Sequence, residues 1–361
     1  MIAFAALSLL ASLQLIAALP QSSTRSVDQE PVLEQRLTSA NIKAPGGQVK
    51  KIRYGPFDIP AMGMLENKDI RNITKPCADC FITGFEAGLE DEAGNSVNTD
   101  VGAWLHHVVM YQAGEGEKDL VCPYQPAKRT FASGNERTPI RISADGKYGI
   151  RVGATSRFSL LYDIVNESDK PVSYYITITY EFSSDKSIKP AEVIYLDVTG
   201  NCGMSYVAPR DGKYTISNSP GYTSAISGKL LAATGHGHDG VAAVQIKVAN
   251  KTVCESQALY GKRAGYTAKP MADMPGMTPG MTGMPSMSHG SSPAQDPSTL
   301  KSQPSIKHIS DTSICKDFGE VKAGEEVVIE AMYDTDTYGL NKLMGQFVEL
   351  MGISLVYVAV E

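Results

Sequence analysis

Two histidines separated by one residue, His236 and His238, are the side chains whose spacing points most directly to chemistry. They follow an apolar run, residues 229–234, that reads as a β-strand. Alternate residues of a strand project from the same face, so the two imidazoles should point together. Asp239-Gly240 then suits a tight hairpin turn. Two imidazoles side by side at a strand end form half of a transition-metal site. The alternative is a pair of exposed turn histidines.

A second pair, His106-His107, lies in the apolar run Trp104 to Tyr111. The two pairs account for four of the six histidines in the chain. Neighbouring residues of a strand point to opposite faces, so joint metal binding by this pair requires a twist, a bulge or a strand end. The alternative is one core histidine and one surface histidine.

A stretch rich in methionine, proline, glycine and serine occupies about residues 265–305. This composition opposes a packed core, so we expect a disordered insert. Thioether sulfur is a soft ligand that favours Cu(I), and a mobile chain that carries several such groups can capture copper. The alternative is a linker whose methionines have no function. The candidate auxiliary copper ligands are Met274, Met277, Met281, Met284, Met287 and His289.

The rest of the chain reads as short strands separated by turns rich in Gly, Asn, Asp and Pro, with no long stretch of helical period. This pattern predicts an all-β fold of two antiparallel β-sandwich domains in tandem, of the jelly-roll type. We expect a flexible leader over residues 20–48 and domains over 49–188 and 189–361, the second interrupted by the insert.

Residues 1–19 are almost wholly apolar and read as a signal peptide, although the usual positive start is missing and an uncleaved anchor is the alternative. No later apolar stretch is long enough to span a bilayer. We therefore expect a secreted protein, extracellular or associated with the cell wall, that leaves the membrane after signal cleavage. Glycosylation sequons begin at Asn72, Asn166 and Asn250. The net charge of −6 and the dispersed basic residues argue against nucleic acid as a partner.

Six cysteines fit up to three disulfides in an oxidising compartment. They are Cys77, Cys80, Cys122, Cys202, Cys254 and Cys315. Cys77-Ala-Asp-Cys80 also has the spacing of a redox or zinc motif, but there is no second CxxC, so a disulfide is favoured. Cys254 and Cys315 bracket the methionine-rich insert, and a disulfide between them would anchor its base.

These motifs together resemble the copper type II, ascorbate-dependent monooxygenases, the family of peptidylglycine α-hydroxylating monooxygenase and dopamine β-monooxygenase. That family has two β-sandwich domains, each of which binds one copper ion. Its adjacent histidine pair is similar to His106-His107, its His-x-His to His236-Gly-His238, and its last methionine ligand to Met351. The chain is more closely similar to secreted, mainly fungal proteins with an Asn-Glu-Arg-Thr stretch, here Asn135 to Thr138, and a GHxHDG turn.

The resemblance implies that His236, His238 and Met351 bind a catalytic copper ion that activates oxygen for aliphatic C–H hydroxylation. It implies a second copper ion at His106-His107 that stores an electron, with ascorbate or another reductant as donor. The family's third histidine at this second site is absent from residues 158–164, where Tyr162 or Asp163 could take its place.

The resemblance has a second departure, because Thr234 occupies the position of the arginine that anchors peptide substrates. We therefore do not expect a substrate with a terminal carboxylate. Arg137 could bind an anion or pair with a carboxylate such as Glu136.

The sequence thus favours a secreted copper-dependent monooxygenase, an oxidoreductase. The alternative is a non-catalytic secreted copper-binding protein that uses the histidine sites and the insert. A third reading is a glycosylated structural β protein without metal. Substrate and oligomeric state stay open.

Overall fold

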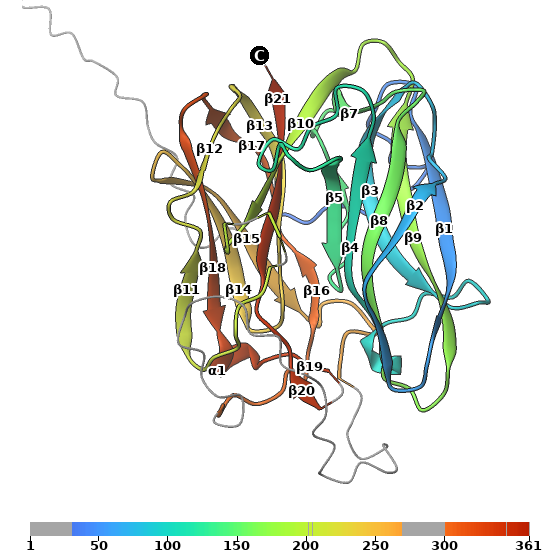
Figure 1. Cartoon of the computed structure of the whole chain (residues 1–361), viewed down its shortest axis with the longest axis vertical. Coiled ribbons are helices and arrows are strands. Elements are labelled where there is room, and N and C mark those ends of the chain that lie inside the picture. The colour runs from blue at the N-terminus through green and yellow to red at the C-terminus, as the bar shows by residue number, and fades with distance from the viewer. Residues whose placement is uncertain (1–30, 201, 204, 269–299, 344, 361) are drawn as a thin grey trace, which may run out of the picture. The chain divides into compact units, whose positions relative to one another are not determined.

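The computed structural model describes residues 31–200, 202–203, 205–268, 300–343 and 345–360. These described residues group into one compact unit, coloured along the chain in Figure 1. The predicted signal peptide, the first part of the predicted leader, and the methionines and His289 of the predicted insert lie outside the described residues. Residues 31–47 contain no helix or strand, and Leu37 and Ala44 within them are buried.

The first half of the described chain forms two facing layers of strands. Its elements are β1 (Gln48–Ile59), β2 (Gly63–Ile73), β3 (Cys80–Glu90), η1 (Thr99–Val101), β4 (Ala103–Ala113), β5 (Lys128–Gly134), β6 (Ile140–Arg141), β7 (Tyr148–Val152), β8 (Arg157–Asn166) and β9 (Val172–Ser183). One layer has the order β1-β9-β3-β7, with β6 beside β3, and the other has the order β2-β8-β4-β5. Alternating apolar residues such as Ile82, Phe85, Leu105 and Ile178 fill the core between the layers.

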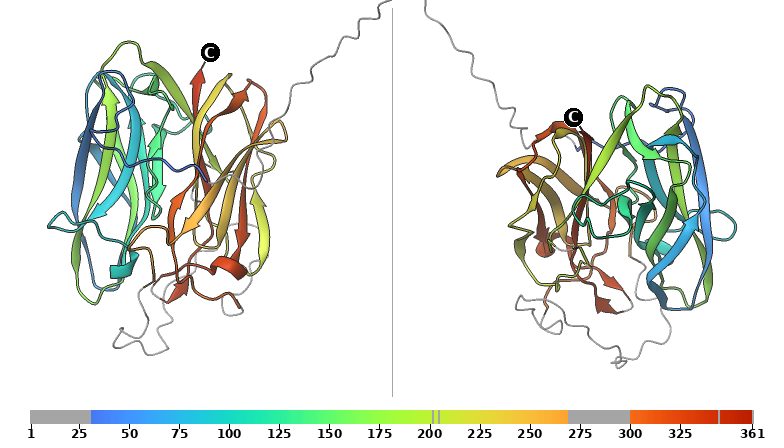
Figure 2. Two further views of the ribbon diagram at one scale, coloured as in Figure 1. Left: turned by 180° about the vertical axis from the view of Figure 1, so that it is seen from behind. Right: turned by 45° about the horizontal axis from the view of Figure 1, so that its top comes forward.

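The second half of the described chain forms a further pair of layers (Figure 2). Its elements are β10 (Lys189–Asp197), β11 (Lys213–Ser217), β12 (Tyr222–Thr223), β13 (Gly228–Gly237), β14 (Val241–Val248), β15 (Lys251–Tyr260), β16 (Ile309–Thr312), β17 (Ile314–Val321), β18 (Glu326–Asp334), α1 (Thr335–Tyr338), β19 (Lys342–Leu343), β20 (Gln346–Phe347) and β21 (Gly352–Val360). The order is β10-β21-β13-β17 in one layer and β11-β18-β14-β15-β16 in the other, with β12 beside β18.

A short parallel pairing of β7 with β10, at Tyr148 and Lys189, joins the layers of the two halves into one nine-stranded sheet. The other strand pairings among the named strands are antiparallel. The predicted all-β fold with antiparallel sheets is therefore confirmed. The predicted division into domains at residue 188 stays a prediction.

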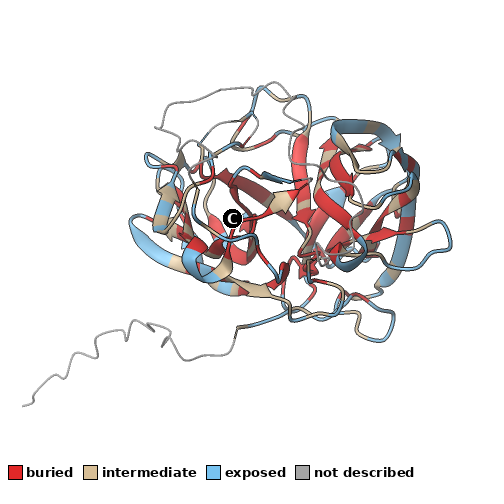
Figure 3. Cartoon of the chain, turned by 90° about the horizontal axis from the view of Figure 1, so that it is seen from below, coloured by how far each residue is buried: buried red, intermediate tan, exposed pale blue. Residues whose placement is uncertain are grey.

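Strand β21 is buried on both faces, from Gly352 to Ala359 (Figure 3). Leu355 and Tyr357 join the core that contains the first-half strands, whereas Val356 and Val358 join the second core with β14 and β18. A strand covered on both sides reads as a continuous apolar run, as β21 does. The layer that contains β13 and β21 therefore packs against the first half with one face, and this face carries His236.

All six cysteines form disulfides within the described chain: Cys77–Cys80, Cys122–Cys202 and Cys254–Cys315. The disulfide prediction is confirmed, including the pair that brackets the insert. Thr267 and Lys307 also form an isolated bridge near the base of the insert.

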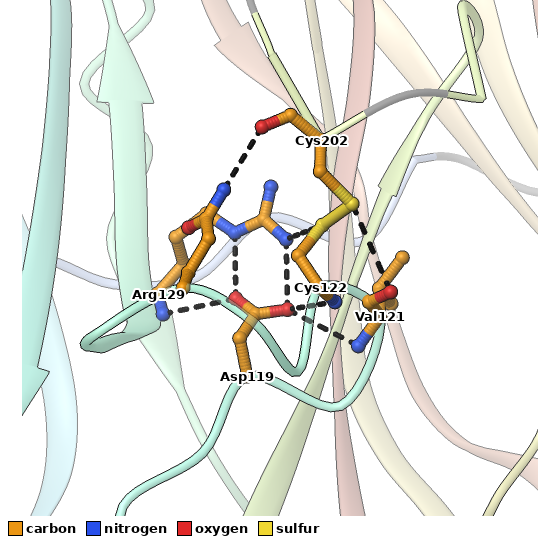
Figure 4. The surroundings of a disulfide bond; sticks show 6 residues. Asp119, Val121, Cys122, Arg129 and Cys202 are labelled. Carbon is orange, nitrogen blue, oxygen red and sulfur yellow. Dashed lines mark hydrogen bonds and ion pairs between the residues drawn. A yellow bond between two sulfur atoms is a disulfide. The ribbon is translucent and has the colours of Figure 1, made fainter.

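The Cys122–Cys202 disulfide ties the connection between β4 and β5 to the segment after β10 (Figure 4). Beside it, Asp119 binds Arg129 through contacts of 2.7 Å to Nε and 2.8 Å to Nη2, and Arg129 Nη2 lies 3.0 Å from the Cys122 sulfur. A covalent link and a buried ion pair thus fix this junction.

None of the described helices is long and apolar enough to cross a bilayer. Of the predicted glycosylation sites, Asn72 and Asn250 are exposed. Asn166 is buried, and its amide nitrogen donates to the carbonyls of Pro60 and Lys170. Glycosylation stays a prediction, and the accessible side chains favour Asn72 and Asn250.

Candidate metal centre

Both histidines of the first pair point to the same side of strand β4 because the strand is irregular there. The register of β4 against β8 shifts between Leu105 and His107, so that Leu105 pairs with Ile164 and His107 with Asp163. Such a bulge removes the strict alternation of faces. The ring centroids of His106 and His107 lie 4.1 Å apart. The bulge that joint metal binding would require is therefore present.

The second pair lies at the end of β13, where His236 pairs with Ile353 of β21 and His238 follows the last strand residue. Both rings approach the first pair. His238 lies 4.7 Å from His106 and 5.0 Å from His107, and His236 lies 5.3 Å from His107, between ring centroids. The family resemblance implies separate copper sites for the two pairs, whereas the structure brings the pairs into one cluster.

The nitrogens of three of these histidines lie close enough to share one ion. Within the described part of the chain, one nitrogen each of His106, His107 and His238 forms a group whose atoms lie within 4.8 Å of one another. Nε2 of His107 and Nε2 of His238 are 2.8 Å apart. We call His106, His107, His236 and His238 the histidine cluster.

Hydrogen bonds at Nδ1 determine which nitrogen of each ring is free. His107 Nδ1 donates to Asp163 Oδ2 at 3.0 Å, and His238 Nδ1 donates to the carbonyl of Glu349. A neutral imidazole whose Nδ1 carries the proton has a lone pair on Nε2. The two facing Nε2 atoms would therefore repel each other unless a cation lay between them. This arrangement favours a bound metal ion.

Burial keeps the imidazoles of His107 and His238 neutral, as metal ligands must be. Burial lowers the pKa of His107 to about 4; the neighbouring His106 adds to this effect and Asp163 opposes it. Burial and the adjacent histidines also hold the pKa of His238 well below its ordinary value. Burial alone would raise the pKa of Asp163, but its contacts with His106 and His107 outweigh burial and lower it strongly.

A cavity of about 20 Å³ adjoins the cluster, enough for roughly one water-sized group. Its walls are Trp104, His106, Asn135, Glu136, His236, Gly237, His238, Asp239, Ile309 and Asn341. Both ring nitrogens of His106 and Nε2 of His236 are buried without a hydrogen-bond partner in the described protein. Unpartnered buried nitrogens are costly, and ligation of a metal would satisfy them. Imidazole nitrogen suits copper, so the residues present fit the expected ion.

Asp163 lies in the stretch where the family has a third histidine that this chain lacks. It accepts hydrogen bonds from His107 and from the backbone N–H of Asn67. It supports a ligand and lies outside the three-nitrogen group. Tyr162 instead packs against Phe57 in the core, with ring centroids 4.5 Å apart.

Met351, the predicted thioether ligand, is buried in the core of the first half. Its backbone N–H and carbonyl both bind the Tyr333 hydroxyl. Gly237 packs against the same carbonyl. The segment around Met351 thus contributes to the cluster through the Glu349 carbonyl that orients His238.

Sequence reasoning missed two features of the site. His236 Nδ1 lies 3.1 Å from Oε2 of Glu136, whose sequence position suggests only a pairing with Arg137. Arg137 instead donates to the Val97 carbonyl and to Asn98 Oδ1. No spacing rule links Glu136 with a histidine a hundred residues later, and the Asn-Glu-Arg-Thr stretch was the only signal.

The second missed feature is His308, which donates from Nδ1 to Asp239 at 2.5 Å. Its ring packs edge-on against Trp104 at 4.4 Å between centroids. The sequence predicts only a turn at Asp239, yet this residue also lines the cavity. The turn after His238 therefore places a buried carboxylate at the wall of the site.

No family model matches the chain. It is 26% identical over 320 residues to Probable copper-dependent oxygenase M1 of Phoma sp., which covers 86% of this chain and 72% of that protein. It is 25% identical over 281 residues to Probable copper-dependent oxygenase clz3 of Cochliobolus lunatus, which covers 76% of this chain and 78% of that protein. These distant relatives support a copper oxygenase assignment and do not test the narrower resemblance to the ascorbate-dependent monooxygenases.

Among solved structures, PNGF-II matches with a TM-score of 0.39 and 9% identity over 85% of this chain and 65% of that chain. PNGase F, a glycosylasparaginase from Flavobacterium meningosepticum, matches with a TM-score of 0.36 and 10% identity over 86% of this chain and 96% of that chain. Similarity at this level carries no argument about function.

Proposed function

We propose that this chain is a secreted copper-dependent oxygenase that hydroxylates an aliphatic C–H bond at a single copper centre. The observation that carries the proposal is the facing pair of Nε2 atoms, 2.8 Å apart, contributed by His107 of β4 and by His238 after β13. The names of two relatives as probable copper-dependent oxygenases support copper and oxygen as reactants.

His106, His107 and His238 would hold the ion, with His236 as a fourth nitrogen. Bound copper would supply the one-electron steps that dioxygen needs to react with a C–H bond. The balanced reaction consumes dioxygen, two electrons and two protons, and yields an alcohol and water. Ascorbate, or another reductant of the same class, would provide the electrons.

The other residues of the site prepare the ligands and limit access of water. Asp163 and the Glu349 carbonyl hold protons on Nδ1 of His107 and His238, which leaves Nε2 free. Trp104 and Ile309 form apolar parts of the cavity wall. The cavity admits only about one water-sized group, so an organic substrate would approach from the side of His107, whose side chain is 17% exposed.

Secretion is part of the proposal. The three disulfides are typical of an oxidising compartment, and residues 1–19 have the composition of a signal peptide.

Oxygen consumption by the copper-loaded protein tests the proposal. With ascorbate and a panel of aliphatic substrates, the wild type should consume oxygen and form a hydroxylated product, whereas His238→Ala should show only background. Glu90→Gln changes a buried residue of the first half that pairs with Lys51 and Arg53, away from the cluster, and should consume oxygen like the wild type. Equal consumption by the wild type and His238→Ala would contradict the proposal.

A non-catalytic copper-binding protein is the second candidate, and the small cavity favours it because about 20 Å³ leaves no room for an organic substrate. The two candidates predict the same copper content. Substrate-dependent oxygen uptake separates them, because a binding protein would show none.

A further inference from the structure

A tight turn of the first half, from Gly134 to Thr138, lies directly against the histidine cluster. The Gly134 N–H donates to Glu136 Oε1 at 2.9 Å, and the Arg137 N–H donates to the Gly134 carbonyl at 3.2 Å. Arg137 has a φ of +46° within this turn. These contacts fix the Glu136 carboxylate relative to the end of β5.

The carboxylate of Glu136 reaches across to a histidine of the second half. Its Oε2 and Oε1 lie 3.1 and 3.2 Å from Nδ1 of His236. Glu136 is 5% exposed, and both side chains line the cavity. A buried carboxylate needs a hydrogen-bond donor, and the Nδ1–H of His236 supplies it.

The His236 ring lies so close to the turn that only glycine fits at position 134. A Cβ atom on Gly134 would lie 2.4 Å from Cε1 of His236 and 2.9 Å from the backbone carbonyl of His106. Real Cβ atoms essentially never approach that closely. The turn therefore packs against the Nδ1 and Cε1 atoms of His236, so Nε2 points away from the Glu136 carboxylate.

We propose that Glu136 is a positioning residue for the metal centre, which holds the proton of His236 on Nδ1 and so makes Nε2 the ligand atom. This inference rests on the proposed function. Nε2 of His236 is buried without a protein hydrogen-bond partner, and its ring shares the cavity wall with His106 and His238. A carboxylate on the far nitrogen orients a histidine ligand and increases its basicity.

The contact also couples metal binding to the packing of the two halves. Glu136 follows β5, whereas His236 belongs to β13, which is part of the second-half layer. The orienting group and the ligand therefore come together only when the second-half layer packs against the first half. Asp163 and His107, in contrast, lie on the paired strands β8 and β4 of the first half.

A purely structural ion pair is the competing explanation for the contact. In that case, loss of the carboxylate charge would lower stability but leave copper affinity unchanged. Glu136→Gln separates the two explanations, since glutamine keeps the size of the side chain and removes its charge. Glu90→Gln is the matched control, because Glu90 is 6% exposed, lies in the first half and pairs with Lys51 and Arg53.

The experiment measures Cu(I) affinity by competition with a chelator and the EPR spectrum of the Cu(II) form, with full-length folded protein. Glu136→Gln should weaken binding about 10- to 100-fold and alter the copper hyperfine splitting. His236→Ala should weaken binding at least as much, and Glu90→Gln should match the wild type.

The role of Glu136 would be overturned if Glu136→Gln kept the copper affinity and EPR spectrum of the wild type while His236→Ala bound copper more weakly. The proposed function would then still stand. Unchanged affinity in His236→Ala would also overturn the role of Glu136, because Nε2 would then not be a ligand. Failure of the wild type to bind copper would remove the proposed function itself and this inference with it.

Discussion

Nε2 of His107 and Nε2 of His238 lie 2.8 Å apart, although 131 residues separate them in the chain. The first atom is fixed by the hydrogen bond of His107 to Asp163 and the second by that of His238 to the Glu349 carbonyl. Each half of the chain thus contributes one Nε2 lone pair, and the two lone pairs face each other. A metal ion between them would bind both halves at once.

Gly134→Ala tests the close packing of the turn on His236. The added methyl group should displace the His236 ring and weaken copper binding by about the factor expected for Glu136→Gln, because both changes disturb the same ligand. Gly153→Ala is the control, since a Cβ atom added at Gly153 would meet only the Ser156 hydroxyl, at 3.4 Å. Copper competition measures both variants, and equal affinities for the two would show that the approach at Gly134 is unimportant.

The metal-free protein should lose stability as pH falls from about 6.5 to 4. The pKa of His107 is about 4 in the folded state, below its unfolded value of about 6.5, so the unfolded chain binds more protons in this range. The loss from this residue alone is of the order of 3 kcal/mol. Calorimetry at several pH values gives the slope of the free energy of unfolding against pH. His107→Gln should flatten it, and an identical slope in that variant would contradict the assignment.

Removal of the Cys122–Cys202 disulfide should destabilise the fold more than removal of Cys77–Cys80. The sequence separations are 80 and 3 residues, and in the chain-entropy model the loops contribute about 4.5 and 2 kcal/mol. Paired Cys→Ser variants compared by chemical unfolding provide the measurement. A greater loss of stability from removing Cys77–Cys80 would contradict this prediction. It would show that local contacts beside Cys122–Cys202, such as the Asp119–Arg129 pair in Figure 4, hold that junction together without the disulfide.

Deletion of residues 269–299 should leave the histidine cluster intact and lower the total copper bound. The first cut end directly follows Thr267, which bridges to Lys307, and the Cys254–Cys315 disulfide closes the surrounding loop, so the fold should tolerate a short replacement linker. Metal analysis of the wild type and the deletion variant, both loaded with Cu(I), gives the number of copper ions bound per chain. An unchanged copper content would remove the insert from any role in binding copper.

The histidine pairs and the strands that carry them could be predicted from sequence because their signals are local. The apolar run of residues 229–234 before His236 predicts a strand, and Asp239-Gly240 predicts the turn that follows it. The Cys254–Cys315 disulfide was expected because the two cysteines bracket the insert. The sequence shows that joint binding by His106 and His107 requires a twist, a bulge or a strand end, but the bulge itself depends on the pairing of β4 with β8.

The merging of the two pairs could not be predicted, because it depends on how the layer that contains β13 and β21 packs against the first half. Nothing local in β13 tells which face will be covered by the first half and which by β14. The contacts of Glu136 with His236 and of Asp239 with His308 depend on the same long-range packing. The family resemblance suggested two separate sites and gave no reason to look for one.

Copper quantitation with EPR on His107→Ala and His238→Ala, beside the wild type, tests the central claim most directly. A single shared centre predicts about one copper per chain beyond any bound by residues 269–299, and loss of the whole signal of the centre in either variant, since each removes one of the facing nitrogens. Two copper ions per chain, with each variant losing only one of two distinct signals, would contradict it.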